Sequence, residues 1–366
     1  MQWSAEQDDA LLAVDRWLNK GEDQVFRLFG YAGAGKTTLA RHIAEHASGD
    51  VAFAAFTGKA AHVMRQKGCT GATTIHALIY RPASGEEGAD EPTFTLRHDA
   101  PASKASLIII DECSMVDEDL GRDLLSFGAP VLVLGDSAQL PPVKGGGFFT
   151  DCEPDFMLTE IHRQAADNPI IRFSMAVRDG SDNDDHAFYN CEALSIIKRD
   201  EITSEAILEA DQVLVGTNRT RRRFNGRIRE LKEHDDAAPE AGEKLVCLRN
   251  NSKKGLLNGS LWTVTLKKSP RGGRARMVVA PEDGGRTASI AVPIALFTDG
   301  PEAVPYQVRR GADEFDFGYA LTVHKAQGSQ WDNVVLFDES YAFREHKARW
   351  LYTAVTRAAN KLTIVR

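Results

Sequence analysis

The chain has 366 residues, of which 43% are hydrophobic and 26% are charged, an ordinary composition for a soluble globular protein. Its formal net charge of −8 argues against a surface that is basic throughout, although a local basic channel for nucleic acid stays compatible with it. The sequence holds no run of eighteen apolar residues, so it predicts no membrane-spanning helix.

Strands and helices are predicted to alternate from the N-terminus. Apolar runs indicate strands over 25–29, 51–56, 107–110 and 131–134, with helices over 38–47 and from residue 58 onward. Continuous apolar strands separated by helices are typical of a parallel sheet. The stretch 80–104 breaks this pattern, because it is rich in Pro, Gly and Glu and only 93–96 alternates. We predict there a small hairpin-like protrusion.

A second α/β series begins near residue 156, and Asn168 with Pro169 marks the start of a helix. Its other elements are a strand over 212–215, a helix over 219–232, a strand over 333–337, a helix over 350–358 and a strand over 361–365. From 242 to about 315, short β-rich pieces alternate with Gly and Pro turns, which predicts a small β-barrel. We therefore expect two α/β domains, 1–153 and 154–366, with insertions at about 80–104 and 250–315.

The cysteines and the N-terminus indicate the compartment. Five cysteines are scattered along the chain without a CxxC pair: Cys69, Cys113, Cys152, Cys191 and Cys247. This usage favours reduced thiols and no zinc site. The first residues are too polar for a signal peptide. We expect a cytoplasmic protein.

Residues 30–37 read Gly-Tyr-Ala-Gly-Ala-Gly-Lys-Thr and fit the phosphate-binding pattern GxxxxGK[ST]. A strand is expected before them and a helix after them, so backbone N–H groups and the helix N-terminus converge on one concavity. Lys36 is expected to reach the β- and γ-phosphates, and the Thr37 hydroxyl to bind Mg²⁺. The loop predicts an ATP site with these binding residues: Gly33, Ala34, Gly35, Lys36, Thr37 and Thr38.

Polar residues follow two more of the predicted strands. Asp111 and Glu112 end the run at 107–110, where one carboxylate can bind the metal ion with Thr37 and the other can orient the attacking water. Gln139 lies in the polar segment 135–139 after the next strand. It is predicted to contact the γ-phosphate or its water, with an ordinary polar turn as the alternative.

Together with this loop, seven blocks in family order resemble superfamily 1 DNA helicases of the RecD-like branch, including small phage helicases. The blocks are 56–61, 74–76, 111–112, 135–142, 158–164, 322–330 and 352–358. The resemblance covers nearly the whole chain. It implies two RecA-like P-loop NTPase-type parallel-sheet domains that bind ATP and Mg²⁺ between them, with single-stranded DNA across their tops.

The resemblance also implies further nucleotide contacts. Arg163 and Arg357 would neutralise charge on the γ-phosphoryl group in the transition state; the alternative for each is a surface salt bridge. Gln327 and Gly328 belong to the block that reaches the nucleotide. Gln7 resembles the glutamine that reads adenine, and residues 4–7 also fit a helix capping box.

The expected DNA contacts combine hydroxyl groups with basic side chains, which suits binding to phosphate oxygens. They are Thr57, Lys59, Thr74, His76, Thr322, His324 and Lys325. For His76, capping or packing is an equal alternative. Phe94 is a candidate wedge at the tip of the protrusion. Six arginines in 219–229 favour a solvated helix face over a DNA contact.

The function implied is an ATP-dependent DNA helicase that translocates on single strands in the 5′-to-3′ direction and unwinds duplex DNA. The alternatives are a single-strand translocase with little unwinding of its own, or a DNA-binding ATPase subunit of a repair or recombination complex. Single-stranded and forked DNA are the expected partners, with replication or recombination proteins besides. We expect a monomer.

Overall fold

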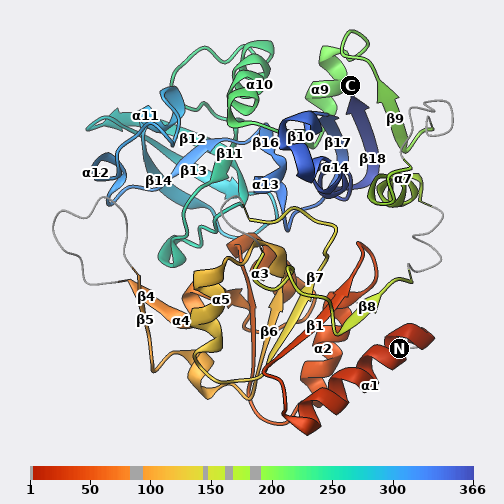
Figure 1. Ribbon diagram of the computed structural model, residues 1–366. Coiled ribbons are helices and arrows are strands. Elements are labelled where there is room, and N and C mark those ends of the chain that lie inside the picture. Colours follow the sequence, from red (N-terminus) through yellow and green to blue (C-terminus); the bar gives the residue numbers. More distant parts are fainter. Residues whose placement is uncertain (1–2, 83–93, 143–146, 161–167, 182–190) are drawn as a thin grey trace. The chain divides into compact units, whose positions relative to one another are not determined.

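The computed structural model describes residues 3–82, 94–142, 147–160, 168–181 and 191–366 (Figure 1). Their contacts divide the chain into two compact units, and the division falls between Arg178 and Asp179.

The first unit is built on a parallel sheet with the strand order β3-β2-β6-β7-β1-β8. Its strands are β1 (Val25–Gly30), β2 (Val51–Ala55), β3 (Thr73–Thr74), β6 (Leu107–Asp111), β7 (Val131–Gly135) and β8 (Phe156–Leu158). Its helices are α1 (Ala5–Lys20), α2 (Lys36–His46), α3 (Gly58–Gln66), α4 (Ile75–Ile79), α5 (Glu118–Leu125) and α7 (Pro169–Arg178), with short 3₁₀ turns η1 (Pro101–Lys104) and η2 (Cys113–Met115).

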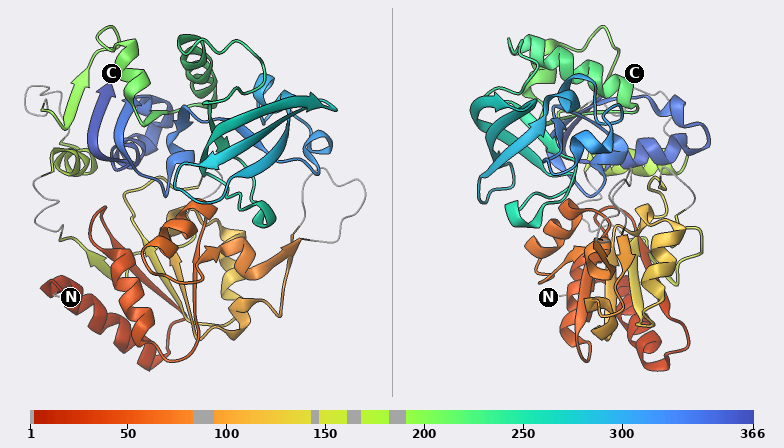
Figure 2. Two further views of the ribbon diagram at one scale, coloured as in Figure 1. Left: turned by 180° about the vertical axis from the view of Figure 1, so that it is seen from behind. Right: turned by 90° about the vertical axis from the view of Figure 1, so that its left-hand side faces the viewer.

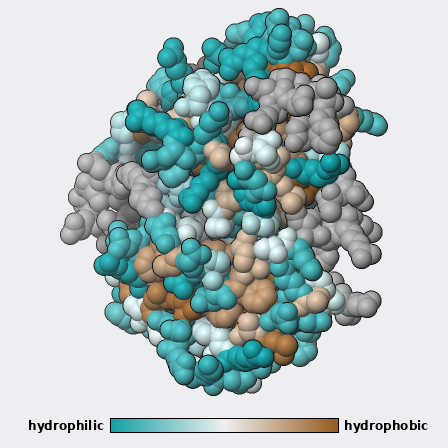
Figure 3. Space-filling view, turned by 45° about the vertical axis from the view of Figure 1, so that its right-hand side comes forward, coloured by the Kyte–Doolittle hydropathy of each residue, from teal (hydrophilic) through white to brown (hydrophobic). Residues whose placement is uncertain are grey.

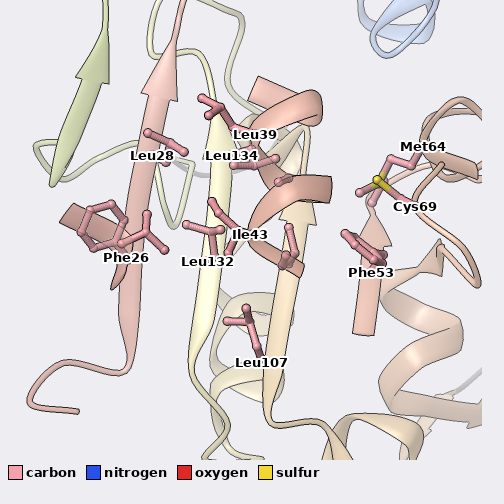
Figure 4. Close-up of a cluster of buried hydrophobic side chains, with 14 of the residues drawn as sticks. Phe26, Leu28, Leu39, Ile43, Phe53, Met64, Cys69, Leu107, Leu132 and Leu134 are labelled. Atoms are coloured by element: carbon pink, nitrogen blue, oxygen red, sulfur yellow. The ribbon is translucent and has the colours of Figure 1, made fainter. Parts of the chain in front are cut away.

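Both faces of this sheet are buried, which is why its central strands β6 and β7 consist almost entirely of apolar residues. Leu132 and Leu134 of β7 face one cluster, together with Leu39 and Ile43 of α2 (Figure 4). The alternate β7 residues face the opposite cluster, which α4 and α5 complete. The predicted strands at 25–29, 51–56, 107–110 and 131–134 are confirmed. The P-loop follows the first of them, at the carboxyl end of β1.

The first unit extends further along the chain than the expected boundary at residue 153. β8 pairs in parallel with β1, with Leu28 opposite Phe156 and Gly30 opposite Leu158. A boundary at 153 would therefore remove an edge strand from the first sheet.

The protrusion has a two-stranded antiparallel base made of β4 (Tyr80–Pro82) and β5 (Phe94–Leu96). Phe94 pairs with Pro82 along the backbone. The side chain of Phe94 and the segment 83–93, where the tip was expected, lie outside the described residues.

The second unit holds a parallel sheet of order β16-β10-β17-β18-β9. Its strands are β9 (Leu194–Ile197), β10 (Gln212–Val215), β16 (Ala320–Thr322), β17 (Trp331–Phe337) and β18 (Ala358–Val365). Its helical segments are α9 (Ser204–Glu209), α10 (Asn218–Leu231), α13 (Val323–Ala326), η4 (Ser340–His346) and α14 (Lys347–Val355). In the sequence, the elements of this parallel sheet are interrupted after α10 and continue at β16.

An antiparallel sheet of order β14-β13-β12-β11-β15 fills that interruption and lies beside the parallel sheet of the same unit (Figure 2). Its elements are β11 (Lys244–Cys247), η3 (Ser252–Lys254), β12 (Leu261–Arg271), β13 (Arg274–Pro281), β14 (Ala288–Pro293), α11 (Ile294–Thr298), α12 (Tyr306–Arg309) and β15 (Phe315–Phe317). The sheet curls, since the Asp313 N–H beside β15 donates to the Ala291 carbonyl of β14 at 3.1 Å. The expected range 250–315 omits strand β11, which lies between β12 and β15.

The surface carries both hydrophilic and apolar side chains. Hydrophilic side chains cover much of the face drawn in Figure 3, and apolar side chains gather in its lower half. Within the described part of the chain, no helix combines the length and apolar character needed to span a membrane.

Candidate nucleotide and nucleic-acid sites

The P-loop joins β1 to α2 in a conformation that depends on glycine. Gly33 and Gly35 have φ of 84° and 83°, in the left-handed region that other residues rarely adopt. A Cβ on Gly30 would lie 2.7 Å from Leu158 Cβ on β8. The loop therefore turns tightly against the sheet and opens on the N-terminus of α2, a geometry suited to a phosphate anion.

Lys36 reaches back across this loop. Its Nζ donates to the Gly30 carbonyl at 2.5 Å and to the Tyr31 carbonyl at 3.0 Å. Both acceptors are neutral, so phosphate oxygens placed in the same concavity would be stronger partners for the ammonium.

The Thr37 hydroxyl donates to Asp111 Oδ2 at 2.9 Å, across 74 positions of sequence. The contact brings the start of α2 to the end of β6, as the strand-end argument predicts. A hydroxyl and a carboxylate are the kind of oxygen ligands that Mg²⁺ takes together with substrate phosphates. Among the described residues no group of three or more His, Cys, Asp or Glu could hold a metal ion.

Glu112 has an unusual backbone. Its φ of 54° and ψ of 48° are left-handed, although it is not glycine. Such conformations cost roughly 1–3 kcal/mol and persist only where the surroundings enforce them. Here its N–H donates to Asp111 Oδ1 at 2.9 Å, and the next residue, Cys113, is fully buried. The chain thus turns sharply at Glu112, beside the Thr37–Asp111 contact.

Gln139 is buried in the loop that follows β7. Its N–H donates to the Asp136 carbonyl at 3.1 Å, while Asp136 Oδ1 accepts from the Ala138 N–H at 3.0 Å. The polar turn expected as the alternative is therefore present. The Gln139 Oε1 atom is also buried, without a hydrogen-bond partner in the described part of the chain. A buried amide oxygen of this kind is costly, so both interpretations of Gln139 remain compatible with the structure.

Gln7 forms the capping box and also contacts the P-loop. Its Oε1 accepts from the Ser4 N–H at 3.1 Å, and the Ser4 hydroxyl accepts from the Gln7 N–H at 3.3 Å. Its Nε2 donates to the Ala34 carbonyl at 3.2 Å, and the side chain is only 4% exposed. The capping interpretation is confirmed. An adenine contact by Gln7 stays a prediction, and it would require these bonds to exchange.

Sequence reasoning missed a contact between the P-loop and the end of α7. The Arg178 guanidinium lies over the Tyr31 ring, 3.9 Å from the ring centroid, in a cation–π arrangement. Tyr31 occupies a variable position of the P-loop pattern, and Arg178 is far from it in sequence. No local signal could have connected the two residues.

In the second unit, Arg357 precedes β18 at the edge where the parallel strands begin. Its Nε donates to the Thr353 carbonyl at 3.0 Å and its Nη1 to the Ser329 carbonyl at 3.2 Å. The side chain is 6% exposed, so the surface salt bridge proposed as its alternative is wrong. Gln327, which is buried, and Gly328, with φ of 73°, lie in the segment that leads to Ser329. Arg163 lies outside the described residues.

Three threonines predicted to contact DNA have the same structural role. Thr57, Thr74 and Thr322 each cap the helix that follows a strand, accepting a backbone N–H at 3.1, 3.2 and 3.4 Å respectively. Their hydroxyls are thus engaged in helix capping. Thr217 does the same after β10, at 3.1 Å, and sequence reasoning did not single it out. The signal was present, since β10 is an apolar strand followed by a threonine, as in β2.

The basic residues of this set differ in environment. Lys59 lies in the first turn of α3 and is half-buried. Burial lowers the pKa of His76, whose ring lies 5.6 Å from that of Tyr80, so the packing alternative for His76 is supported. Burial and the charge of His346 lower the pKa of His324. Burial, with the charge of Arg221, lowers the pKa of Lys325 to about 8.

The arginine-rich helix α10 is only partly the solvated face that was expected. Arg221 is 0% exposed, and its NH1 lies 2.5 Å from Asp316 Oδ2 of β15. Arg229 is largely buried and pairs with Glu243 at 2.7 Å. These ion pairs join α10 to β15 of the antiparallel insertion and to Glu243, the residue just before β11. The expectation is wrong for these two arginines, because their charges are neutralised by carboxylates far away in sequence.

The first sheet, its P-loop and the Thr37–Asp111 contact define a P-loop nucleotide-binding protein. The sequence pattern of the AAA domain family matches residues 2–200, and that of the UvrD-like helicase C-terminal domain matches residues 317–365. Because the first match takes in more than half of the 366 residues, the chain belongs to the AAA domain family. The two matches together confirm the resemblance to superfamily 1 helicases of the RecD-like branch.

The chain is similar to the ATP-dependent RecD2 DNA helicase of Deinococcus radiodurans, with 28% identity over 91% of this chain and 46% of that protein. It therefore spans less than half the length of this relative. Bacteroides Pif1 bound to single-stranded DNA has a TM-score of 0.64 at 22% identity, over 100% of this chain and 92% of that chain. Pif1 helicases described at forked duplex DNA give a TM-score of 0.65 at 21% identity with the same coverage. These likenesses confirm the fold of two RecA-like domains.

Proposed function

We propose that the protein is an ATP-dependent DNA helicase that translocates on single-stranded DNA, 5′ to 3′, and unwinds duplexes ahead of it. The observation that carries this proposal is the Thr37–Asp111 contact with Glu112 beside it, next to a P-loop. These residues are the parts that Mg-ATP hydrolysis requires. The likeness to a RecD2 DNA helicase and to Pif1 bound to single-stranded DNA supports DNA as the substrate.

In this proposal each group has a role that its surroundings support. Mg²⁺, held by Thr37 and Asp111, would offset negative charge on the phosphates. The Lys36 ammonium would bind the γ-phosphate, and Glu112 would orient the attacking water. Gln139, with its buried amide oxygen, would contact that water.

Arg357 of the second unit, together with Arg163, would stabilise charge on the γ-phosphoryl group in the transition state, and the role of Arg357 would make hydrolysis depend on the second domain. A buried guanidinium bonded only to neutral groups, as Arg357 is among the described residues, keeps its charge available for a phosphate.

Strand separation on tailed duplexes tests the direction. A duplex with only a 5′ tail should be unwound when Mg-ATP is present, and a duplex with only a 3′ tail should not. Unwinding from the 3′ tail alone would reverse the proposed direction. DNA-stimulated hydrolysis without unwinding of either substrate would leave a single-strand translocase.

Lys325 predicts a pH dependence of DNA binding. Its pKa of about 8 means that the ammonium is largely charged at pH 7 and loses its proton between pH 7 and 9. Affinity for single-stranded DNA should therefore fall about threefold to tenfold over this range, as one phosphate contact weakens. Fluorescence anisotropy with an oligothymidylate at pH 7 and 9 measures this. Lys325→Arg, which stays charged, is the control: an equal fall in that variant would contradict the role of Lys325.

Substitution of Phe94 should affect the unwinding of duplex DNA without affecting ATP hydrolysis. Phe94→Ala should leave single-strand-stimulated ATPase unchanged and slow strand separation several-fold, because an aromatic ring can stack on the last base pair. Rapid-quench unwinding assays on a 5′-tailed duplex measure the rate. Thr95→Ala, which changes an exposed neighbour on β5, is the matched control. Unchanged unwinding by Phe94→Ala would exclude Phe94 as a wedge.

A further inference from the structure

The segment η4, which joins β17 to α14, carries an exposed aromatic side chain. Tyr341 is 69% exposed, more than any other large hydrophobic side chain among the described residues. Where proteins bind single-stranded nucleic acid, exposed aromatic rings serve as platforms on which bases stack.

The base of this segment packs beside His324, which the sequence predicts to contact DNA. The Phe343 ring stacks on the buried Trp350 ring at a centroid distance of 5.4 Å and an interplanar angle of 17°. On its other side it lies 5.6 Å from the His324 ring. Tyr341 therefore stands two residues from a ring that contacts His324.

A second anchor joins the segment to the start of α10. Glu339, just before η4, is buried, and its carboxylate accepts from the Gly216 N–H at 2.7 Å and the Thr217 N–H at 3.2 Å. Thr217 and Thr322 follow β10 and β16, and η4 follows β17, all in one parallel sheet. Tyr341 thus lies at the same carboxyl edge of the sheet as the two capping threonines.

The segment is also cationic. Arg344, Lys347 and Arg349 are exposed, and within the described residues none of them forms an ion pair. The one acidic residue between 340 and 349, Glu345, lies 3.8 Å from His346 Nε2. Lys347 and Arg349 stand in the first turn of α14, where the helix dipole disfavours cations. These charges therefore do not stabilise the helix, and an external anion would.

Arg344 is held in a strained conformation, with φ of 47° and ψ of −112°. Strain at a residue that is not glycine is typical of binding and switch segments. It redirects the chain between η4 and α14, and so sets the position of Tyr341 relative to the basic residues.

We propose that Tyr341 stacks on a base of bound single-stranded DNA, while Arg344, Lys347 and Arg349 bind the adjacent phosphates. This inference rests on the proposed function and extends the DNA contact from His324 along η4. An aromatic ring among unpaired cations fits a single strand, because every base offers a face for stacking and every nucleotide carries a phosphate.

The first test measures affinity for an oligothymidylate and for the same oligomer with abasic sites, using fluorescence anisotropy. Tyr341→Ala should weaken binding to the oligothymidylate about tenfold, and Tyr341→Phe should bind as the wild type does. On the abasic oligomer, the wild type and Tyr341→Ala should differ much less. Val308→Ala removes another exposed apolar side chain, on α12, and should change nothing. Circular dichroism shows that each variant is folded.

The second test measures salt dependence. Replacing Arg344, Lys347 and Arg349 together by Gln should reduce the slope of log affinity against log salt concentration by about two, at ~0.7 per phosphate contact on a single strand. If the wild type binds the oligomer and both sets of variants match it, the η4 proposal is overturned and a protein partner becomes the better explanation of the patch. If the wild type binds no single-stranded DNA, the proposed function itself fails.

Discussion

Replacing Lys36 with Ala should lower the rate of ATP hydrolysis about a thousandfold, the scale expected when a charge-stabilising group is removed from a preorganised site. Among the described residues, Lys36 Nζ donates hydrogen bonds to the carbonyls of Gly30 and Tyr31 and to no other group. Lys36 is the first residue of α2, and Leu39 and Ile43 anchor this helix in the core. The Lys36→Ala variant should therefore fold, and its lower rate of ATP hydrolysis should reflect a loss of catalysis.

Steady-state phosphate release at saturating Mg-ATP measures the effect of Lys36→Ala. Lys104→Ala is a matched control, because Lys104 is an exposed lysine of the same unit, at the end of η1. Turnover retained by Lys36→Ala would overturn the assignment of the P-loop.

Glu112→Gln should bind ATP with an affinity close to the wild type and hydrolyse it about a hundredfold to a thousandfold more slowly. The amide keeps the size of the side chain but cannot accept a proton from the attacking water. The Thr37–Asp111 contact, which belongs to other side chains, should persist. Binding of a fluorescent ATP analogue and single-turnover hydrolysis separate the two effects.

The control for Glu112→Gln is Glu118→Gln, which neutralises an exposed glutamate in the first turn of α5. It should bind and hydrolyse ATP at wild-type rates. If Glu112→Gln did the same, Glu112 could not be the residue that orients the water, and Gln139 would be the next candidate.

The central strands could be predicted because both faces of each sheet are buried, so a strand such as β7 appears as an uninterrupted apolar run. β8 could not be assigned, since its three residues carry no pattern and its place depends on pairing with β1. β18 begins at Ala358, three residues earlier than predicted. There Ala358 pairs with Trp331, a contact that no local pattern shows.

The parts of the nucleotide site that consist of short sequence motifs could be predicted. The P-loop pattern and an acidic pair after an apolar strand were sufficient to predict the contact between Thr37 and Asp111. The left-handed backbone of Glu112 and the burial of Arg221 were not predictable. Each depends on groups brought close by the fold, such as Asp316 for Arg221.

ATP hydrolysis with and without single-stranded DNA is the most direct measurement of the proposed motor. Slow hydrolysis of Mg-ATP alone should rise at least tenfold when an oligothymidylate is added, because a motor that moves on a strand couples its hydrolysis to that strand. Hydrolysis that is unchanged by DNA at any concentration would contradict the helicase proposal, and would direct attention to a protein or RNA partner for the same ATPase.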